Sequence, residues 1–108
     1  MNYRVKTLKS FEKQAKQFAK KYHSFTFEYE KLIDSLENNP FQGTSLGKSC
    51  YKIRMAISSK GKGKRGGARL ITHIIVKNEI VYLMSIFDKS EKEDISDIEL
   101  DELLIKIP

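Results

Sequence analysis

The chain has 108 residues and a formal net charge of +6, and 40% of its residues are hydrophobic. This length fits one domain, residues 1–108, with a single hydrophobic core. No apolar run approaches the ~20 residues that cross a bilayer, so a membrane-spanning helix is excluded. The N-terminus lacks the apolar stretch of a signal peptide and Cys50 has no partner for an internal disulfide, so we expect a cytoplasmic protein.

The N-terminal third predicts a strand followed by a helical hairpin. Residues 3–7 alternate Tyr, Val and Thr with Arg and Lys, the period of two that is typical of a strand with one buried face. Residues 10–23 then repeat apolar side chains at helical spacing, and Ser10 is expected to cap this helix. A second helix is expected from about Thr26 to the sequence NNP, because proline disfavours helical geometry in the residue before it.

The remaining chain predicts three strands and a last helix. The strands are runs rich in β-branched and aromatic residues, and we expect an antiparallel meander over residues 50–57, 68–77 and 79–88. Ser96 and Glu99 have the spacing of a capping box, which predicts a C-terminal helix after them. The element order indicates an α+β fold with its helices on one face of the sheet, which leaves the other face free for function.

Strand alternation predicts which side chains share that free face. The apolar residues of the run at 50–57 should face the helices, so Lys52 and Arg54 should face away from them. Both faces of the run at 68–77 are largely apolar. We assign Arg69 and His73 to the free face, because burial of an unpaired guanidinium is costly.

The same alternation applies to the last strand. Tyr82, Met84 and Ile86 should face the helices, which leaves Phe87 on the free face and Lys89 just beyond the strand. If the three strands pair in sequence order, one surface of the sheet collects six candidate functional residues: Lys52, Arg54, Arg69, His73, Phe87 and Lys89.

The basic residues are unevenly distributed. Residues 38–78 contain nine Lys or Arg residues and no acid, which predicts a surface that meets a polyanion. Five of these bases lie in the glycine-rich stretch SSKGKGKRGGARL. Arg69 is at its end, and the glycine spacing around the other four suits mobile contacts to a phosphate backbone: Lys60, Lys62, Lys64 and Arg65. A solvated basic loop with no partner is the alternative interpretation.

The sequences CYKIR, SKGKGKRGGARLI and VYLMSIFDKSEKEDIS together resemble the RelE/HigB toxins of bacterial toxin–antitoxin systems, members of the RelE/ParE superfamily. The resemblance implies a RelE-like fold. It also implies a ribosome-dependent endoribonuclease that cleaves messenger RNA in the ribosomal A site and thereby inhibits translation, without a metal or cofactor. The implied partners are the ribosome with its 16S rRNA, messenger RNA, and a cognate antitoxin of the helix-turn-helix type.

The resemblance also assigns roles by position. The strand pair of the family matches Lys52 and Arg54, the arginine after the double glycine matches Arg69, and the basic residue after the last strand matches Lys89. We expect Arg69 to bind the scissile phosphate, Lys52 and Arg54 to transfer protons and stabilise charge, and Lys89 or His73 to complete the acid–base chemistry. Contacts to RNA or the ribosome are expected from Lys48, Lys60, Lys62, Lys64, Arg65 and Phe87.

The sequence departs from the RelE/HigB toxins at two positions that affect the chemistry. Phe87 and His73 stand where tyrosine or other aromatic residues are common, so position 87 supplies no phenol for proton transfer, and a weakened or inactive toxin stays open. One cysteine and two distant histidines give no metal-ligand spacing, so no metal site is expected. A ParE-like inhibitor of DNA gyrase and a non-catalytic RNA-binding module remain the alternative functions.

Overall fold

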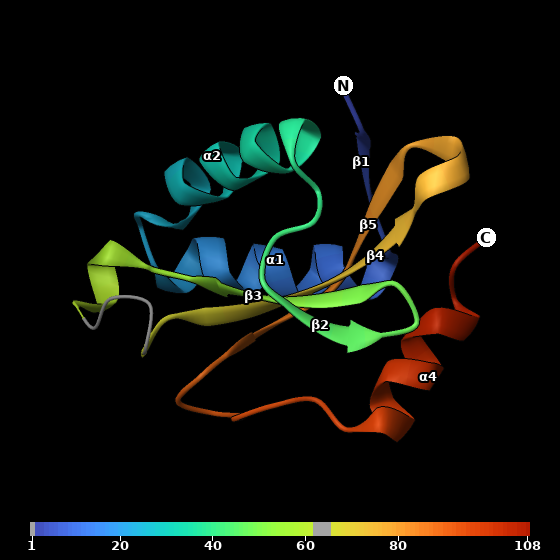
Figure 1. Ribbon diagram of the computed structural model, residues 1–108. Coiled ribbons are helices and arrows are strands. Elements are labelled where there is room, and N and C mark those ends of the chain that lie inside the picture. The colour runs from blue at the N-terminus through green and yellow to red at the C-terminus, as the bar shows by residue number, and fades with distance from the viewer. Residues whose placement is uncertain (1, 62–65) are drawn as a thin grey trace.

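A five-stranded sheet runs through the part of the chain that the computed structural model describes, residues 2–61 and 66–108. Its strand order is β1–β5–β4–β3–β2 (Figure 1). The strands are β1 (Arg4–Thr7), β2 (Thr44–Gly47), β3 (Cys50–Met55), β4 (Ala68–Ile75) and β5 (Ile80–Asp88). The helices are α1 (Lys9–Lys21), α2 (Phe25–Asn38) and α4 (Asp97–Ile105), with 3₁₀ turns η1 (Ser58–Lys60) and η2 (Val76–Asn78).

The sheet confirms the predicted meander and extends it at both edges. β3, β4 and β5 pair in antiparallel order, as expected, whereas β1 lies parallel to β5 at one edge. β2 was not predicted, because its four residues, TSLG, carry no strand-like alternation. A tight hairpin joins β2 to β3 with positive φ angles at Lys48 and Ser49.

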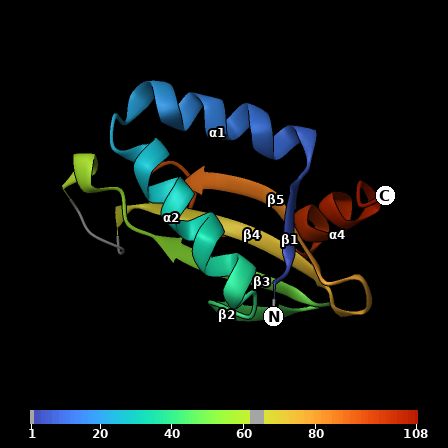
Figure 2. The same cartoon turned by 90° about the horizontal axis from the view of Figure 1, so that it is seen from above.

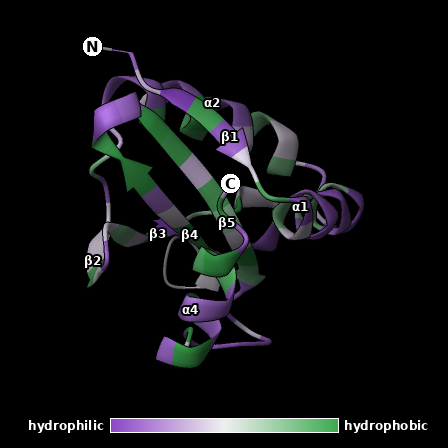
Figure 3. Ribbon diagram, turned by 90° about the vertical axis from the view of Figure 1, so that its right-hand side faces the viewer, coloured by the Kyte–Doolittle hydropathy of each residue, from purple (hydrophilic) through white to green (hydrophobic). Residues whose placement is uncertain are grey.

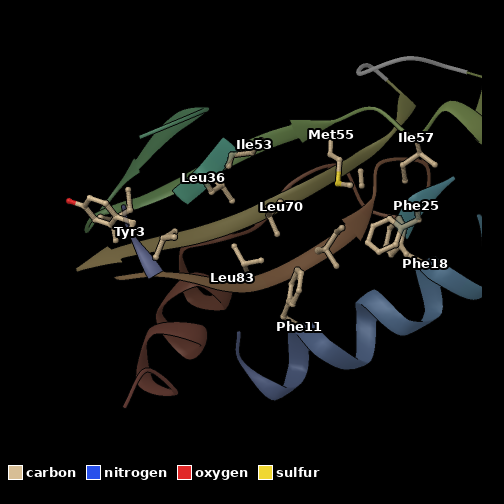
Figure 4. Close-up of a cluster of buried hydrophobic side chains, with 14 residues drawn as sticks. Tyr3, Phe11, Phe18, Phe25, Leu36, Ile53, Met55, Ile57, Leu70 and Leu83 are labelled. Atoms are coloured by element: carbon tan, nitrogen blue, oxygen red, sulfur yellow. The ribbon is translucent and has the colours of Figure 1, made fainter. Parts of the chain in front are cut away.

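α1 and α2 cover one face of the sheet, as Figure 2 shows from above. Their aromatic side chains point into the main core, where Phe11 and Phe25 pack with Leu70 and Leu83 from the two central strands (Figure 4). Burial of each such side chain contributes roughly 1.5–3 kcal/mol to folding. The N-cap prediction is wrong: Ser10 lies inside α1, and its hydroxyl donates a 3.4 Å hydrogen bond to the carbonyl oxygen of Met84.

The prediction that the helices lie on one face is wrong for α4. This helix packs against the opposite face, where Leu100 belongs to a second apolar cluster with Cys50, Ile71 and Met84. The central strands are mostly green in Figure 3, which marks them as hydrophobic, so their second face also requires an apolar cover. The capping box is confirmed, because Ser96 and Glu99 exchange both of its hydrogen bonds. The α+β fold class is confirmed as well.

A β-bulge changes the alternation of β5. Ile71 pairs with Ser85 but the next residue of β4 pairs with Leu83, so Met84 has no partner across the ladder. Leu83 and Ile86 therefore both reach the α1 and α2 layer, whereas Tyr82 and Met84 lie in the cluster against α4. The prediction that Tyr82 and Met84 face the helical hairpin is wrong, and that for Ile86 is confirmed.

Within the described residues, no helix combines the length and the apolar character that crossing a membrane requires.

Candidate functional site

The strand pairing places the predicted cations next to one another. Arg54 of β3 lies opposite Arg69 of β4, and Arg69 in turn lies opposite Phe87 of β5. Lys52 lies two residues before Arg54 and therefore on the same side of β3. We call Lys52, Arg54 and Arg69 the cationic strand face; its three positive charges come from two adjacent strands.

Arg69 is the least accessible of the three cations, with 4% of its surface exposed. Its Nη1 donates a 3.1 Å hydrogen bond to the carbonyl oxygen of Ala68. Burial lowers the pKa of the Arg69 guanidinium and the charge of Arg54 lowers it further, while the negative charge of Asp94 raises it. Since an arginine in a protein stays protonated at neutral pH, this side chain is a fixed and largely desolvated cation.

Arg54 has the opposite character, because it is exposed and makes no hydrogen bond or ion pair with any residue in the described ranges. Its guanidinium is therefore available to an external anion. Arginine also presents several N–H donors in one plane, an arrangement that matches a phosphate group.

Asp94 places one carboxylate among the cations. Its Oδ2 lies 3.0 Å from Nζ of Lys52, and its Oδ1 accepts a 2.8 Å hydrogen bond from the backbone N–H of Ile95. The Ile95 N–H and then the hydrogen bond from Lys52 lower the pKa of Asp94, and the positive charge of Lys89 adds to the effect. A single carboxylate thus interacts with Lys52 of β3, with Arg69 of β4 and with Lys89, which directly follows β5.

The face predicted to be free is partly covered by the tail after β5. Phe87 is buried, and Nζ of Lys92 lies 5.4 Å from the centroid of its ring. Lys89 forms a 3.2 Å ion pair with Glu93, and its backbone N–H donates to Gly67 beside the start of β4. Stacking of a base on Phe87 therefore requires a change in the tail.

His73 and Lys48 lie away from the cationic strand face. His73 is four residues from Arg69 along β4, or roughly 13 Å at the rise of a strand. Nδ1 of His73 lies 3.5 Å from Sγ of Cys50. Burial lowers the pKa of His73, and this effect outweighs backbone hydrogen bonds with Lys48 and Ser49, which raise it. Lys48 forms an ion pair with Asp101 of α4. The structure therefore does not bring His73 to the phosphate position expected at Arg69.

Cys50 offers no reactive group at this position, because burial raises the pKa of its thiol to about 11. Across residues 2–61 and 66–108, no three side chains of His, Cys, Asp or Glu gather as a metal-ligand set.

Lys60 was expected to belong to a mobile phosphate-binding loop, but its ammonium is buried. Nζ lies 2.5 Å from Oδ1 of Asp88, and the side chains of the pair are 7% and 3% exposed. Asp88 also accepts hydrogen bonds from the hydroxyls of Tyr22 and Ser90, at 2.5 and 2.6 Å. A lysine held in this way anchors the start of the loop, and its ammonium is not exposed to an external phosphate in this structure. The other predicted loop contacts, Lys62, Lys64 and Arg65, lie outside the described residues.

Asp88 is not among the residues predicted from the sequence, because no local pattern marks it as part of the site. Burial by itself raises the pKa of Asp88, but the hydrogen bonds from Lys60, Ser90 and Tyr22 outweigh burial and hold the pKa well below its ordinary value. The carboxylate joins the C-cap residue of α1, η1 and the end of β5, and so holds the start of the loop near Arg69.

The family model that matches this chain over residues 4–106 is described as the RelE toxin of the RelE / RelB toxin-antitoxin system. A mutant of the E. coli toxin RelE in the free state is similar in structure, with a TM-score of 0.67, 16% sequence identity and complete coverage of both chains. The isolated E. coli RelE toxin gives a TM-score of 0.62 at 14% identity, covering 97% of this chain and 99% of that chain.

A third similar structure is the intact E. coli RelBE toxin–antitoxin complex. It matches with a TM-score of 0.61 and 17% identity over 80% of this chain and 95% of that chain. At these identities the structural likeness shows the shared fold.

The buried pair of Asp88 and Lys60 predicts a pH-dependent stability. A carboxylate with a lowered pKa stabilises the folded state above its ordinary pKa near 4 and loses this contribution as the pH falls below that value. We expect Asp88→Asn to lower the free energy of unfolding by about 3–5 kcal/mol at neutral pH, because it leaves the Lys60 charge buried without its partner.

Urea denaturation of both proteins from neutral pH to pH 3 measures this effect, and the difference between them should shrink below about pH 4. Asp34→Asn, on the exposed side of α2, is the matched control and should change little. Equal free energies of unfolding at neutral pH, or a difference that grows as the pH falls, would contradict a buried ion pair between Asp88 and Lys60.

Proposed function

This chain belongs to the RelE family of toxins of toxin–antitoxin systems, and from that premise we propose that it is a ribosome-dependent endoribonuclease. In this proposal the protein enters the ribosomal A site in the cytoplasm, cleaves messenger RNA there without a metal ion and so stops translation. A cognate antitoxin of the helix-turn-helix type neutralises it.

The observation that carries the proposal is the position of the Asp94 carboxylate. Its Oδ2 lies 3.0 Å from the ammonium of Lys52, and its charge interacts with Lys89 and Arg69. A phosphate of RNA is also an oxygen anion and prefers the same donors. The exposed ion pair between Asp94 and Lys52 contributes only about 0–1 kcal/mol, so a phosphate with several contacts can replace the carboxylate.

The cations around such a phosphate divide the chemistry among them. With Asp94 displaced, the amine of Lys52 lies free beside the phosphate and takes the proton of the 2′-hydroxyl. The 2′-oxygen bonds to phosphorus and the bond from phosphorus to the 5′-oxygen breaks. Lys89 donates a proton to that leaving oxygen, and the products are a 2′,3′-cyclic phosphate and a 5′-hydroxyl end.

Arg69 stabilises the negative charge that builds on the phosphate oxygens. A preorganised and desolvated donor is effective in this role because it needs no reorganisation during the reaction. Arg54 holds the neighbouring backbone, and contacts to 16S rRNA come from the loop bases Lys62, Lys64 and Arg65.

We expect Arg69→Ala to reduce cleavage by about 10²- to 10³-fold, the usual cost of removing one donor to a developing oxyanion. The measurement is the mapping of messenger RNA 5′ ends in an in vitro translation reaction with intact ribosomes, with and without EDTA. Lys77→Ala in the exposed turn η2 removes the same charge at the far end of β4 and should leave cleavage unchanged.

Two outcomes would contradict the proposed cleavage of messenger RNA and favour another function. DNA breaks in cells whose messenger RNA stays intact would favour a ParE-like action on gyrase. Salt-dependent binding to RNA with no cleavage on ribosomes would favour a non-catalytic binding module.

We also expect Asp94→Asn to strengthen RNA binding, because it removes the carboxylate that competes with phosphate for Lys52. The dissociation constant for a short single-stranded RNA at low salt should fall by roughly twofold to fivefold, the equivalent of an exposed ion pair. Glu102→Gln on the exposed side of α4 neutralises one acid without touching the site and serves as control. An equal effect of both substitutions would indicate net charge alone and contradict the role of Asp94.

A further inference from the structure

Lys89, the proposed proton donor, lies one residue beyond β5, so pairing between strands does not fix its backbone. Figure 1 shows this point, where the chain leaves β5 and turns toward α4. A lysine side chain has a long and flexible stem, so its ammonium keeps a defined position only if the surrounding structure holds it. The contacts on both sides of Lys89 therefore decide how well it serves as an acid.

The backbone of Lys89 is tied to the start of β4. Its N–H donates a 3.0 Å hydrogen bond to the carbonyl oxygen of Gly67. A Cβ atom on Gly67 would lie 2.1 Å from the carbonyl oxygen of Met55 in β3, so only glycine fits at this position. Because Arg69 follows Gly67 by two residues, this hydrogen bond places Lys89 relative to the cation expected at the scissile phosphate.

The chain after Lys89 forms a turn around Asp88. Oδ1 of Asp88 accepts hydrogen bonds from the backbone N–H of Ser90 at 2.9 Å and from the Ser90 hydroxyl at 2.6 Å. The carbonyl oxygen of Asp88 accepts two more, from the N–H groups of Glu91 and Lys92, each at 3.0 Å. Lys89 thus lies inside a turn that closes on one aspartate.

The other contacts of the same carboxylate anchor this turn in the protein. Oδ1 of Asp88 also lies 2.5 Å from Nζ of Lys60, and Oδ2 accepts a 2.5 Å hydrogen bond from the hydroxyl of Tyr22. The Ser90 hydroxyl therefore binds an acceptor that is itself held in place, and a hydrogen bond to an ionised group is stronger than one between neutral groups. Ser90 is exposed, so its hydroxyl fills no space in the core.

The ammonium of Lys89 lies near the cationic strand face. Its positive charge lowers the pKa of Asp94, whose Oδ2 lies 3.0 Å from Nζ of Lys52. Nζ of Lys89 lies 3.2 Å from Oε1 of Glu93, the residue before Asp94. The side chain of Lys89 is 27% exposed, which leaves it accessible to RNA at that face.

We infer that Ser90 is a positioning residue for the acid step of the reaction. Its hydroxyl holds the turn closed on Asp88 and so keeps the ammonium of Lys89 where it protonates the leaving 5′-oxygen. The inference rests on the proposed function, in which Lys89 is the proton donor. In this role Ser90 touches no reacting atom, so its loss should slow only the step that Lys89 assists.

We expect Ser90→Ala to lower the rate of cleavage on intact ribosomes at saturating protein by about tenfold, a part of the roughly 10²- to 10⁴-fold that a general acid supplies. The protein concentration that gives half the maximal rate should stay the same, because the cations that bind RNA are unchanged. Ser90→Thr keeps the hydroxyl and should restore most of the rate. Ser58→Ala, in the exposed turn η1, is the control, because its hydroxyl makes no hydrogen bond with any described residue.

A messenger RNA with sulfur in place of the scissile 5′-oxygen separates this role from a general loss of structure. The 2′-oxygen bonds to phosphorus and the bond from phosphorus to sulfur breaks. The thiolate leaves without a proton, since a thiol is a much stronger acid than an alcohol. Ser90→Ala should therefore cleave this RNA as fast as the wild type does, whereas Arg69→Ala should remain slow on both substrates.

An unchanged rate of Ser90→Ala on the oxygen substrate would overturn the positioning role and leave the proposed reaction in place. An equal loss of rate on the oxygen and sulfur substrates would also overturn it, because the hydroxyl would then support the fold or the phosphate position instead of the proton transfer. Absence of cleavage by the wild type on ribosomes with either RNA would overturn the proposed reaction itself, and the role of Ser90 with it.

Discussion

The cationic strand face depends on the pairing of β3 with β4, which places like charges next to one another. Cross-strand pairing puts Arg54 opposite Arg69 with Lys52 beside them, and like charges on neighbouring strands are destabilising. The cost is tolerated because Arg54 remains in solvent and because Asp94 supplies one carboxylate that acts on both Lys52 and Arg69. A cluster of cations whose counter-ion can be exchanged can bind another anion, and in the proposed function that anion is a phosphate of RNA.

Two carboxylates six residues apart therefore have different roles. Asp88 is buried and accepts hydrogen bonds from three side chains, so its ion pair with Lys60 is a permanent part of the fold. Asp94 is exposed, and its ion pair with Lys52 is weak enough to open. The first holds Lys60 next to the end of β5, and in the proposed function the second occupies the site until a phosphate replaces it.

Much of the fold and the centre of the site follow from local patterns in the sequence. The period of two in residues 50–57 places Lys52 and Arg54 on one side of β3, and the cost of burying a guanidinium assigns Arg69 to the same side, although the structure buries Arg69 there. The face of the sheet on which Tyr82 and Met84 lie was not predictable. It depends on the β-bulge next to Ile71, which arises from the pairing of β4 with β5 and not from the alternation within β5. Asp88 and Asp94 were invisible for a similar reason: their partners Lys60 and Lys52 lie 28 and 42 residues away in the sequence.

The central claim is that a phosphate of RNA takes the place of the Asp94 carboxylate. A structure of the protein with a short RNA whose 2′-hydroxyls are methylated, and which therefore resists cleavage, tests it most directly. A phosphate oxygen is expected within hydrogen-bond distance of Lys52 and Arg69, with Asp94 withdrawn from Lys52. RNA bound elsewhere while the 3.0 Å ion pair between Lys52 and Asp94 stays intact would contradict it.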